Sequence, residues 1–241
     1  MIIWLASYPN SGNDFLRSLL SSYIFSKDGS YNEDVIQNID EFPNNSLFKK
    51  LGVDTNNLDE MNNNYINSQK ILNKKDSIMF LKTFSCFVHT DKFKFTDRHN
   101  TLGVIYVVRD PRNIVFPLSQ SFQLSEEQSL HNLLIKTYLG KESQSHCTTY
   151  LSSWKDHYNS WKVFTRFNKY LLVKYEDLIK DTEKTFLNIL KFIAHLGRVK
   201  FTLDEIKFKN ALKTTELKKL NENDSKKPGK IDVKIKDKLE K

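Results

Sequence analysis

The N-terminal segment constrains the fold more than any other part of the sequence. Residues 2–7 form a short apolar run, and the turn YPNSG (residues 8–12) follows it directly. After the glycine, apolar side chains recur at helical spacing at Phe15, Leu16, Leu19, Leu20 and Tyr23. A strand, a glycine turn and a helix in this order gather free backbone N–H groups and the positive end of a helix dipole, which forms an anion site. An ordinary strand-to-helix turn is the alternative interpretation, and spacing alone does not separate the two.

Further along the chain, apolar runs alternate with helical patterns. The predicted strands are residues 78–81, 103–108 and 170–175. The predicted helices begin near Pro111 or Arg112, and others cover residues 130–138, 151–167 and the stretch after the last strand to about 196. In the polar, asparagine-rich residues 28–75 we expect irregular structure with short helices. Continuous apolar strands that alternate with helices predict an α/β fold, with a parallel sheet flanked by helices and ligands bound where strands end.

Composition indicates a globular chain without a membrane span. The 241 residues are 39% hydrophobic and 12% aromatic, and no Pro-, Gly- or Ser-rich linker divides them, so we expect one domain over residues 1–241. No apolar run approaches the ~20 residues of a membrane span, and the N-terminus is typical of a strand rather than a signal peptide. Two cysteines without a CxxC motif fit a cytoplasmic protein and exclude a cysteine-based zinc site.

The net charge of +8 suits an anionic ligand or a nucleic acid. Residues 200–241 hold 13 lysines and 8 acidic residues, so most of the excess lies in this divergent basic C-terminal part. Acidic and basic residues alternate there, which predicts a solvated helix and tail. Aromatic and basic residues do not interleave as they do in nucleic-acid-binding segments, so no nucleic acid partner is expected.

The N-terminal turn lacks the GK[ST] of a Walker A loop. Residues 4–17, WLASYPNSGNDFLR, resemble the phosphosulfate-binding loop of sulfotransferases that use 3′-phosphoadenosine 5′-phosphosulfate (PAPS). Further blocks resemble segments of that family in the same order: Phe80–Thr83, Tyr106–Asn113, and Trp154–Trp161 followed by Val173–Leu178 and Asp181. Because the ordered blocks extend from residue 1 to about 197, the resemblance implies the P-loop NTPase-like sulfotransferase fold.

The resemblance also implies a site for PAPS and its product, 3′-phosphoadenosine 5′-phosphate (PAP). The backbone N–H groups of Ser11, Gly12 and Asn13 are expected to hold the 5′-phosphate, on a loop that continues through Asp14 and Phe15. Glycine at position 12 lets the backbone approach the anion closely. The structure of the loop is therefore expected to matter as much as its side chains.

Three side chains elsewhere correspond to family residues that contact the donor. Arg109 matches the arginine that grips the 3′-phosphate; the alternative is an ion pair with Asp110 or Glu176. Lys82 matches a lysine that neutralises the transferring group, and the alternative is a surface lysine at a strand end. Tyr175 matches the tyrosine at the nucleotide end of the donor, or packs as a buried tyrosine against the sheet.

The WxxHxxSW and YED segments are interpreted as structural. His157, Ser160 and Trp161 lie on a predicted helix that packs against the core. Glu176 and Asp177 are expected to cap a helix start or to form ion pairs there, because carboxylates are favoured in the first turn.

Two departures from the family pattern lie in the phosphate-binding loop. Asn10, a predicted catalytic position together with Lys82, replaces the lysine or arginine that contacts the leaving phosphate, and removing such a cation takes away several kcal/mol of transition-state stabilisation. Asp14 replaces a hydroxyl; its carboxylate suits the helix dipole but repels a phosphate.

Two further departures lie outside that loop. Phe84 replaces the histidine that is the presumed general base, and His89, five residues on, is a weak candidate substitute. Pro117, still assigned to the donor site, replaces a serine that completes the 3′-phosphate grip, with Ser119 and Ser121 as candidate substitutes.

Because of these departures, the sequence leaves three classes of function open. The first hypothesis is an active sulfotransferase that moves a sulfuryl group to a hydroxyl or amine of a small-molecule or carbohydrate acceptor. The second is a catalytically impaired protein that serves as a nucleotide-binding or scaffold module. The third is a polyanion binder that uses the basic C-terminal part. An active enzyme needs another His, Glu or Lys near Lys82, whereas a binding module does not.

Two other features are expected to shape the site. Residues 28–75 and 116–150 are expected to form the acceptor pocket, but they indicate no particular acceptor. The family's closing loop has its nearest counterpart at Lys226–Lys230. No metal is implied.

Overall fold

The computed structural model describes residues 1–73, 77–89, 93–135, 138–139 and 147–223. The chain divides into two units, each built from three segments. The first unit comprises Met1–Tyr8, Asp40–Tyr106 and His131–Leu172. The second unit comprises Pro9–Ile39, Val107–Leu130 and Val173–Lys241.

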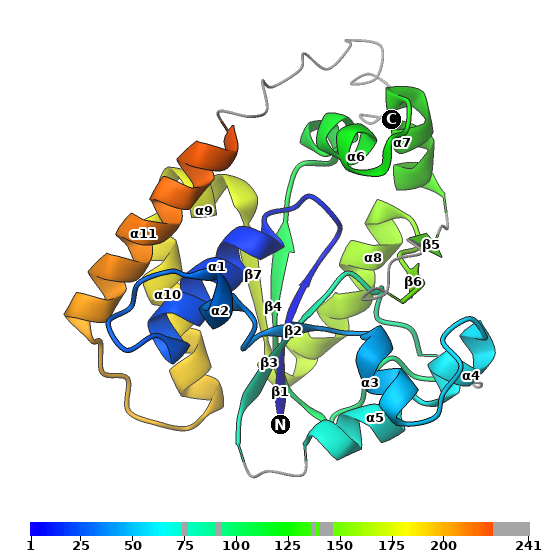
Figure 1. Ribbon diagram of the computed structural model, residues 1–241, viewed down its shortest axis with the longest axis horizontal. Coiled ribbons are helices and arrows are strands. Elements are labelled where there is room, and N and C mark those ends of the chain that lie inside the picture. Colours follow the sequence, from blue (N-terminus) through cyan, green and yellow to red (C-terminus); the bar gives the residue numbers. More distant parts are fainter. Residues whose placement is uncertain (74–76, 90–92, 136–137, 140–146, 224–241) are drawn as a thin grey trace. The chain divides into compact units, whose positions relative to one another are not determined.

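A five-stranded parallel sheet, in the order β2-β3-β1-β4-β7, forms the centre of the fold (Figure 1). Its strands are β1 (Ile2–Ser7), β2 (Asp40–Glu41), β3 (Met79–Thr83), β4 (Thr101–Val108) and β7 (Tyr170–Lys174). The sheet belongs to the first unit, apart from the last two residues of β4 and of β7. All residues of β1 are buried, as in a strand covered on both faces. Helices flank the sheet, so the predicted α/β class is confirmed.

The edge strand β2 lies in the asparagine-rich segment, for which we expected only short helices and irregular structure. Asp40 and Glu41 pair in parallel with Leu81 and Lys82 of β3. Two polar residues have no strand periodicity, and their partner strand is distant in the sequence, so local patterns do not reveal them. The rest of the segment forms the expected short helices α2 (Glu33–Ile36), α3 (Asn45–Lys50), α4 (Leu58–Asn63) and α5 (Tyr65–Leu72).

Trp4 of β1 is central to the core of the first unit. Its ring centroid lies 5.2 Å from that of Phe95, 5.5 Å from that of Phe42 and 6.3 Å from that of Trp161. Its indole N–H donates to Thr101 Oγ1 at 2.9 Å. Large aromatic side chains dominate core energetics, and the indole N–H has a partner, so this cluster fixes β1 in place.

Two predicted helices are present with shifted bounds. The expected helix at 151–167 is α8 (Trp154–Trp161) followed by the 3₁₀ helix η2 (Lys162–Phe167). The expected helix at 130–138 is α7 (Glu126–Leu134), which begins earlier. A short antiparallel pair, β5 (Tyr138–Leu139) with β6 (Thr149–Tyr150), completes the first unit's elements.

Apart from the ends of β4 and β7, the regular elements in the described part of the second unit are helices. Its elements include α1 (Asn13–Phe25), the 3₁₀ helix η1 (Pro111–Asn113), α6 (Val115–Phe122), α9 (Tyr175–Lys180), α10 (Thr182–Leu196) and α11 (Glu205–Asn223). The single helix expected after the last strand is divided at Asp181, whose side chain accepts the N–H of Lys184 and caps α10. An N-cap carboxylate stabilises a new helix start here.

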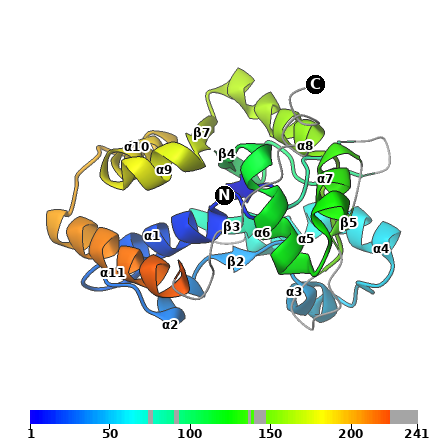
Figure 2. The same ribbon diagram turned by 90° about the horizontal axis from the view of Figure 1, so that it is seen from above.

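Helix α11 corrects one expectation for the C-terminal part. We expected a solvated helix, but Phe208, Ala211 and Thr215 are buried. Helix α11 packs along α1, and both ribbon views show the two side by side (Figures 1 and 2). Tyr23 of α1 meets Phe208 edge to face at 6.4 Å, and Phe186 of α10 stacks on Phe208 at 5.5 Å. One face of α11 therefore contributes to the core of the second unit, although the alternating charges in its sequence predicted a solvated helix.

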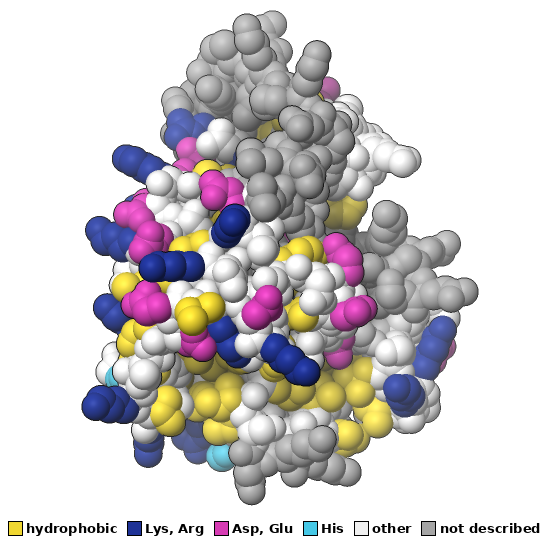
Figure 3. Space-filling model, turned by 60° about the vertical axis from the view of Figure 1, so that its left-hand side comes forward, with side chains coloured by type: hydrophobic (Ala, Val, Ile, Leu, Met, Phe, Trp, Pro, Cys, Tyr) yellow, Lys and Arg dark blue, Asp and Glu magenta, His cyan; other side chains and the backbone are white. Residues whose placement is uncertain are grey.

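The surface has a mixed charge on the face that Figure 3 shows, where Lys and Arg side chains lie among Asp and Glu side chains. Within the described ranges, no helix has the length and apolar character needed to cross a membrane.

Candidate donor site and its neighbours

The turn after β1 has the backbone geometry of an anion site. Asn10 and Gly12 both have left-handed backbone conformations, with φ of 59° and 95°. Gly12 is the N-cap of α1 and provides no side-chain hydrogen bond to the helix. The first N–H groups of a helix have no partner within the helix, so the N-terminal end of a helix favours an anionic ligand. Ser11 Oγ is buried and has no hydrogen-bond partner among the described residues.

Tyr175, the first residue of α9, lies against Gly12. A Cβ atom built on Gly12 would lie 2.4 Å from Tyr175 Cδ2, closer than real Cβ contacts. The same ring forms a cation–π contact with Arg109, whose guanidinium carbon lies 4.3 Å from the ring centroid. Position 12 therefore needs glycine for two reasons, a positive φ and the space that the tyrosine ring occupies.

This double requirement predicts a large effect of Gly12→Ala. We expect the variant to lose stability relative to Gly52→Ala, because Gly52 also has a positive φ (72°) but nothing within 4 Å of a Cβ. The shared φ strain is about 1–2 kcal/mol, and only position 12 adds the clash. Urea denaturation of both variants measures the difference. Tyr175→Ala should partly rescue Gly12→Ala; equal losses at positions 12 and 52 would contradict this account.

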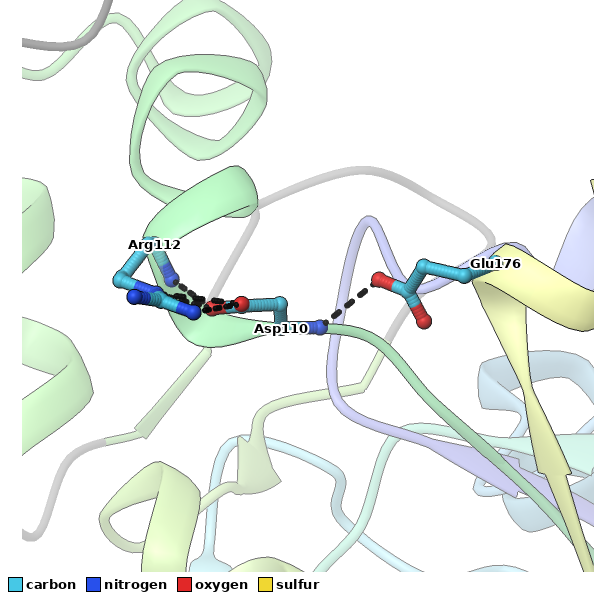
Figure 4. A network of polar contacts seen from close by, with 3 residues as sticks. All are labelled: Asp110, Arg112 and Glu176. Atoms are coloured by element: carbon cyan, nitrogen blue, oxygen red, sulfur yellow. Dashed lines mark hydrogen bonds and ion pairs between the residues drawn. The ribbon is translucent and has the colours of Figure 1, made fainter.

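Arg109 follows β4 and reaches back to the loop. Its Nη1 donates to the backbone carbonyl of Asn10 at 3.0 Å, and its Nε is buried without a hydrogen-bond partner among the described residues. The alternative interpretation paired Arg109 with Asp110 or Glu176. Those carboxylates have other partners: Asp110 forms an ion pair with Arg112 at 2.6 Å, and Glu176 accepts the N–H of Asp110 at 3.2 Å (Figure 4).

The structure also shows a difference between Ser119 and Ser121, the two candidate substitutes for the family serine that Pro117 replaces. Ser121 Oγ donates to Asn10 Oδ1 at 3.2 Å, so it reaches the loop. Ser119 Oγ donates to the carbonyl of Phe116 within its own helix. Pro117 lies in the first turn of α6, where its missing N–H removes no intrahelical bond.

The other loop residues differ in their exposure. Asn13 is buried and Phe15 half-buried, whereas the carboxylate of Asp14 lies in the exposed first turn of α1. That position is favoured by the helix dipole without any ligand.

Lys82, in the first unit, is a buried cation beside Glu41 and Phe84. Only 6% of its side chain is exposed, so the surface-lysine alternative is wrong. Its Nζ lies 3.3 Å from Glu41 Oε2 and 4.3 Å from the centroid of the Phe84 ring. Sequence reasoning missed Glu41, because it belongs to the two-residue strand β2 and no motif marks it. The register that places it beside Lys82 exists only in the folded sheet.

The WxxHxxSW segment holds the backbone that follows β3. His157 Nε2 contacts the Phe84 carbonyl at 3.0 Å, Trp161 Nε1 donates to the Ser85 carbonyl at 3.0 Å, and the Phe87 N–H donates to Ser160 Oγ at 3.0 Å. These three bonds from α8 fix residues 84–87. The interpretation of this segment as structural agrees with these contacts.

His157 is held as one neutral tautomer. A carbonyl only accepts, so Nε2 carries the proton toward Phe84, and Nδ1 accepts the Tyr106 hydroxyl at 2.7 Å. The side chain is fully buried, and burial lowers the pKa of His157 to about 4. At neutral pH the ring carries no charge.

The remaining sequence features to place are His89, the two cysteines and the segment Lys226–Lys230. His89 is exposed and forms an antiparallel bridge with Lys94. Burial raises the pKa of the Cys86 and Cys147 thiols to about 11, so both stay protonated at neutral pH. Within the described part of the chain, no group of three or more His, Cys, Asp or Glu side chains is placed to hold a metal ion. The segment Lys226–Lys230 lies outside the described residues.

Comparison with known families decides the identity of the fold. A model of the sulfotransferase domain matches residues 2–241. The chain belongs to the sulfotransferase family. Its fold is similar to that of mouse sulfotransferase SULT7A1 complexed with PAP, with 16% sequence identity and a TM-score of 0.53 over 89% of this chain. It is also similar to retinol dehydratase in complex with androsterone and the inactive cofactor PAP, at 13% identity and a TM-score of 0.53 over 89% of this chain.

This sulfotransferase-family chain spans 63% of the length of both solved structures. At such low identities the likeness shows the fold alone. No curated protein sequence matches the chain.

Proposed function

We propose that this sulfotransferase-family chain binds PAPS and transfers its sulfuryl group to a hydroxyl or amine. The observation that carries the proposal is the cluster of Gly12, Arg109 and Tyr175 in the second unit. The resemblance assigns these residues to the 5′-phosphate, the 3′-phosphate and the nucleotide end of the donor. They come from three distant parts of the sequence, yet Tyr175 contacts both of the others.

The polar groups of this cluster suit a bound phosphate. Ser11 Oγ and Arg109 Nε are buried donors without a partner among the described residues. Leaving such a group unsatisfied costs about 1–3 kcal/mol, which a phosphate oxygen at each group would offset. The N-terminal end of α1 adds the positive end of a helix dipole, which also favours an anion. The residues present therefore support the binding of an anionic nucleotide.

The resemblance gives each matched residue a proposed role. In the second unit, Arg109 and Tyr175 hold the nucleotide, and the N–H groups of residues 11–13 hold the 5′-phosphate. For Lys82, the resemblance implies the family role of neutralising charge on the transferring group. PAPS supplies an activated sulfuryl group on a phosphate leaving group. Asn10 has an amide where the family has a cation, so this position brings no positive charge to the leaving phosphate.

The acceptor is proposed to be a small molecule or a carbohydrate. The retinol dehydratase structures contain androsterone or retinol as small-molecule ligands, which supports this class. Residues 28–75 and 116–150 are the proposed acceptor-binding segments.

Calorimetry with PAP tests the donor assignment. We expect micromolar affinity for PAP and at least tenfold weaker binding of adenosine 5′-phosphate, because the second ligand lacks the 3′-phosphate that Arg109 would bind. Transfer of labelled sulfur from PAPS to phenol, alcohol, amine and sugar acceptors then tests the reaction. Absence of PAP binding at millimolar concentration would overturn the proposal. PAP binding without transfer to any acceptor or to water would support the nucleotide-binding module instead.

A further inference from the structure

The peptide unit that joins Asn10 to Ser11 connects both halves of the proposed donor site within the second unit. Its N–H belongs to Ser11, which is assigned to the 5′-phosphate. Its carbonyl belongs to Asn10 and accepts a hydrogen bond at 3.0 Å from Nη1 of Arg109, the residue assigned to the 3′-phosphate. This peptide is trans, so its C=O and N–H lie in one plane and point in opposite directions. The bond from Arg109 to the carbonyl therefore also fixes the direction of the Ser11 N–H.

The side chain of Asn10 is held by a different element. Ser121 lies in the last turn of α6, and its Oγ donates to Asn10 Oδ1 at 3.2 Å. Asn10 has a left-handed backbone conformation, with φ of 59°, which asparagine adopts more readily than most other residues. Contacts from the end of β4 and from α6 thus hold one residue in a conformation that is unfavourable for most side chains.

The guanidinium group of Arg109 can transmit the binding of a phosphate to this peptide. Its Nε and Nη1 belong to one rigid plane. The Tyr175 ring lies against that group, and Nε is buried without a hydrogen-bond partner among the described residues. A phosphate bound at Nε would restrict the rotation of the whole plane, Nη1 included, and successive hydrogen bonds polarise one another. A phosphate at Arg109 would therefore steady the Asn10 carbonyl and, through it, the Ser11 N–H.

We infer that the Asn10–Ser11 peptide couples the two phosphate subsites of the donor site, and that Asn10 and Ser121 are positioning residues for this coupling. This inference rests on the proposed function and deepens it. Each phosphate of the nucleotide binds more tightly when the other is present, because the coupling of two binding events is reciprocal. Asn10 brings no charge to the loop, so its contribution is geometric.

Four ligands measure the coupling in calorimetric titrations: PAP, adenosine 5′-phosphate, adenosine 3′-phosphate and adenosine, the weaker ones by competition with PAP. The coupling ratio is the product of the dissociation constants of the two monophosphates divided by the product of those of PAP and adenosine. Independent subsites give a ratio of about one. We expect a ratio of at least about five for the wild type. A general loss of affinity cancels in this ratio, so a merely structural defect does not change it.

Variants of the two positioning residues test the route of the coupling. Asn10→Gly keeps the positive φ and the carbonyl that Arg109 binds, but removes Oδ1. Ser121→Ala removes the hydroxyl at an exposed position, where the loss of stability should be small. We expect each variant to lower the ratio below about two. The double variant should lower it no further, because both changes remove the same contact.

Two further variants are matched controls. Ser121→Thr keeps a hydroxyl and should keep the ratio within about twofold of the wild type. Ser119→Ala removes a hydroxyl from the same helix, but that hydroxyl donates to the Phe116 carbonyl, so the ratio should not change. Urea denaturation of every variant checks that it is folded under the conditions of the titration.

Several results would overturn the inference while leaving the donor site intact. They are a ratio of about one in the wild type, an unchanged ratio in Ser121→Ala, an additional fall in the double variant, and an equal fall in Ser119→Ala. Failure of the wild type to bind PAP at millimolar concentration would instead refute the proposed function itself, and the coupling with it.

Discussion

Arg109→Ala is expected to weaken PAP binding by at least 100-fold. A guanidinium binds a phosphate through two charge-assisted hydrogen bonds, each worth about 1.5–3 kcal/mol, and every 1.4 kcal/mol changes the dissociation constant tenfold. The buried Nε without a partner among the described residues is the donor that the 3′-phosphate would occupy. Calorimetric titration of the variant with PAP measures the loss.

The Arg109 side chain also supports the loop, because its Nη1 binds the carbonyl of Asn10. A distorted loop would weaken PAP and adenosine 5′-phosphate alike, whereas a lost 3′-phosphate contact weakens PAP alone. We therefore expect the preference for PAP over adenosine 5′-phosphate to collapse in Arg109→Ala. Arg112→Ala, which removes a nearby arginine that is paired with Asp110, should keep the preference. Equal losses in the two variants would indicate a general charge effect and contradict the assignment.

Acidification is expected to destabilise the protein through His157. Burial lowers its folded pKa to about 4, against about 6.5 in the unfolded chain. Between these values the unfolded chain binds more protons, so the free energy of unfolding falls as the pH falls from 6.5 to 4. The difference of about 2.5 pH units corresponds to about 3 kcal/mol, fully present above pH 6.5 and lost by pH 4.

Urea denaturation between pH 7 and pH 4 measures this dependence. His157→Gln should be less stable than the wild type at pH 7, because the Tyr106 hydroxyl and the Phe84 carbonyl lose an ideally placed partner. It should also lose about 3 kcal/mol less on acidification. His99→Gln, at an exposed position, is the control and should follow the wild type. Parallel pH profiles for the wild type and His157→Gln would show that the imidazole is not buried in a neutral form.

A buried, neutral His157 also explains why the histidine of the WxxHxxSW segment is not a substitute base. It fixes the backbone of residues 84–87, together with Ser160 and Trp161. Replacing Phe84 by histidine would therefore change a side chain on a backbone that α8 already holds.

Local patterns were sufficient for the main elements of the fold. The apolar runs at β1, β3, β4 and β7 and the helical spacing after Gly12 are strong signals, because buried parallel strands and amphipathic helices repeat along contiguous residues. The ordered motifs then identified the family. The face of α11 that carries Phe208 was missed, because the dense charges around it mask three buried positions.

What only the tertiary structure decided is which side chains meet. The sequence by itself marked Gly12, Arg109 and Tyr175 as candidates, and folding places the Tyr175 ring against both of the others. The sequence held no mark for Glu41, whose place beside Lys82 follows from the register of two strands about forty residues apart. Helical and strand periods are encoded locally, whereas a contact across strands depends on a register that the whole hydrophobic pattern of the sheet must select.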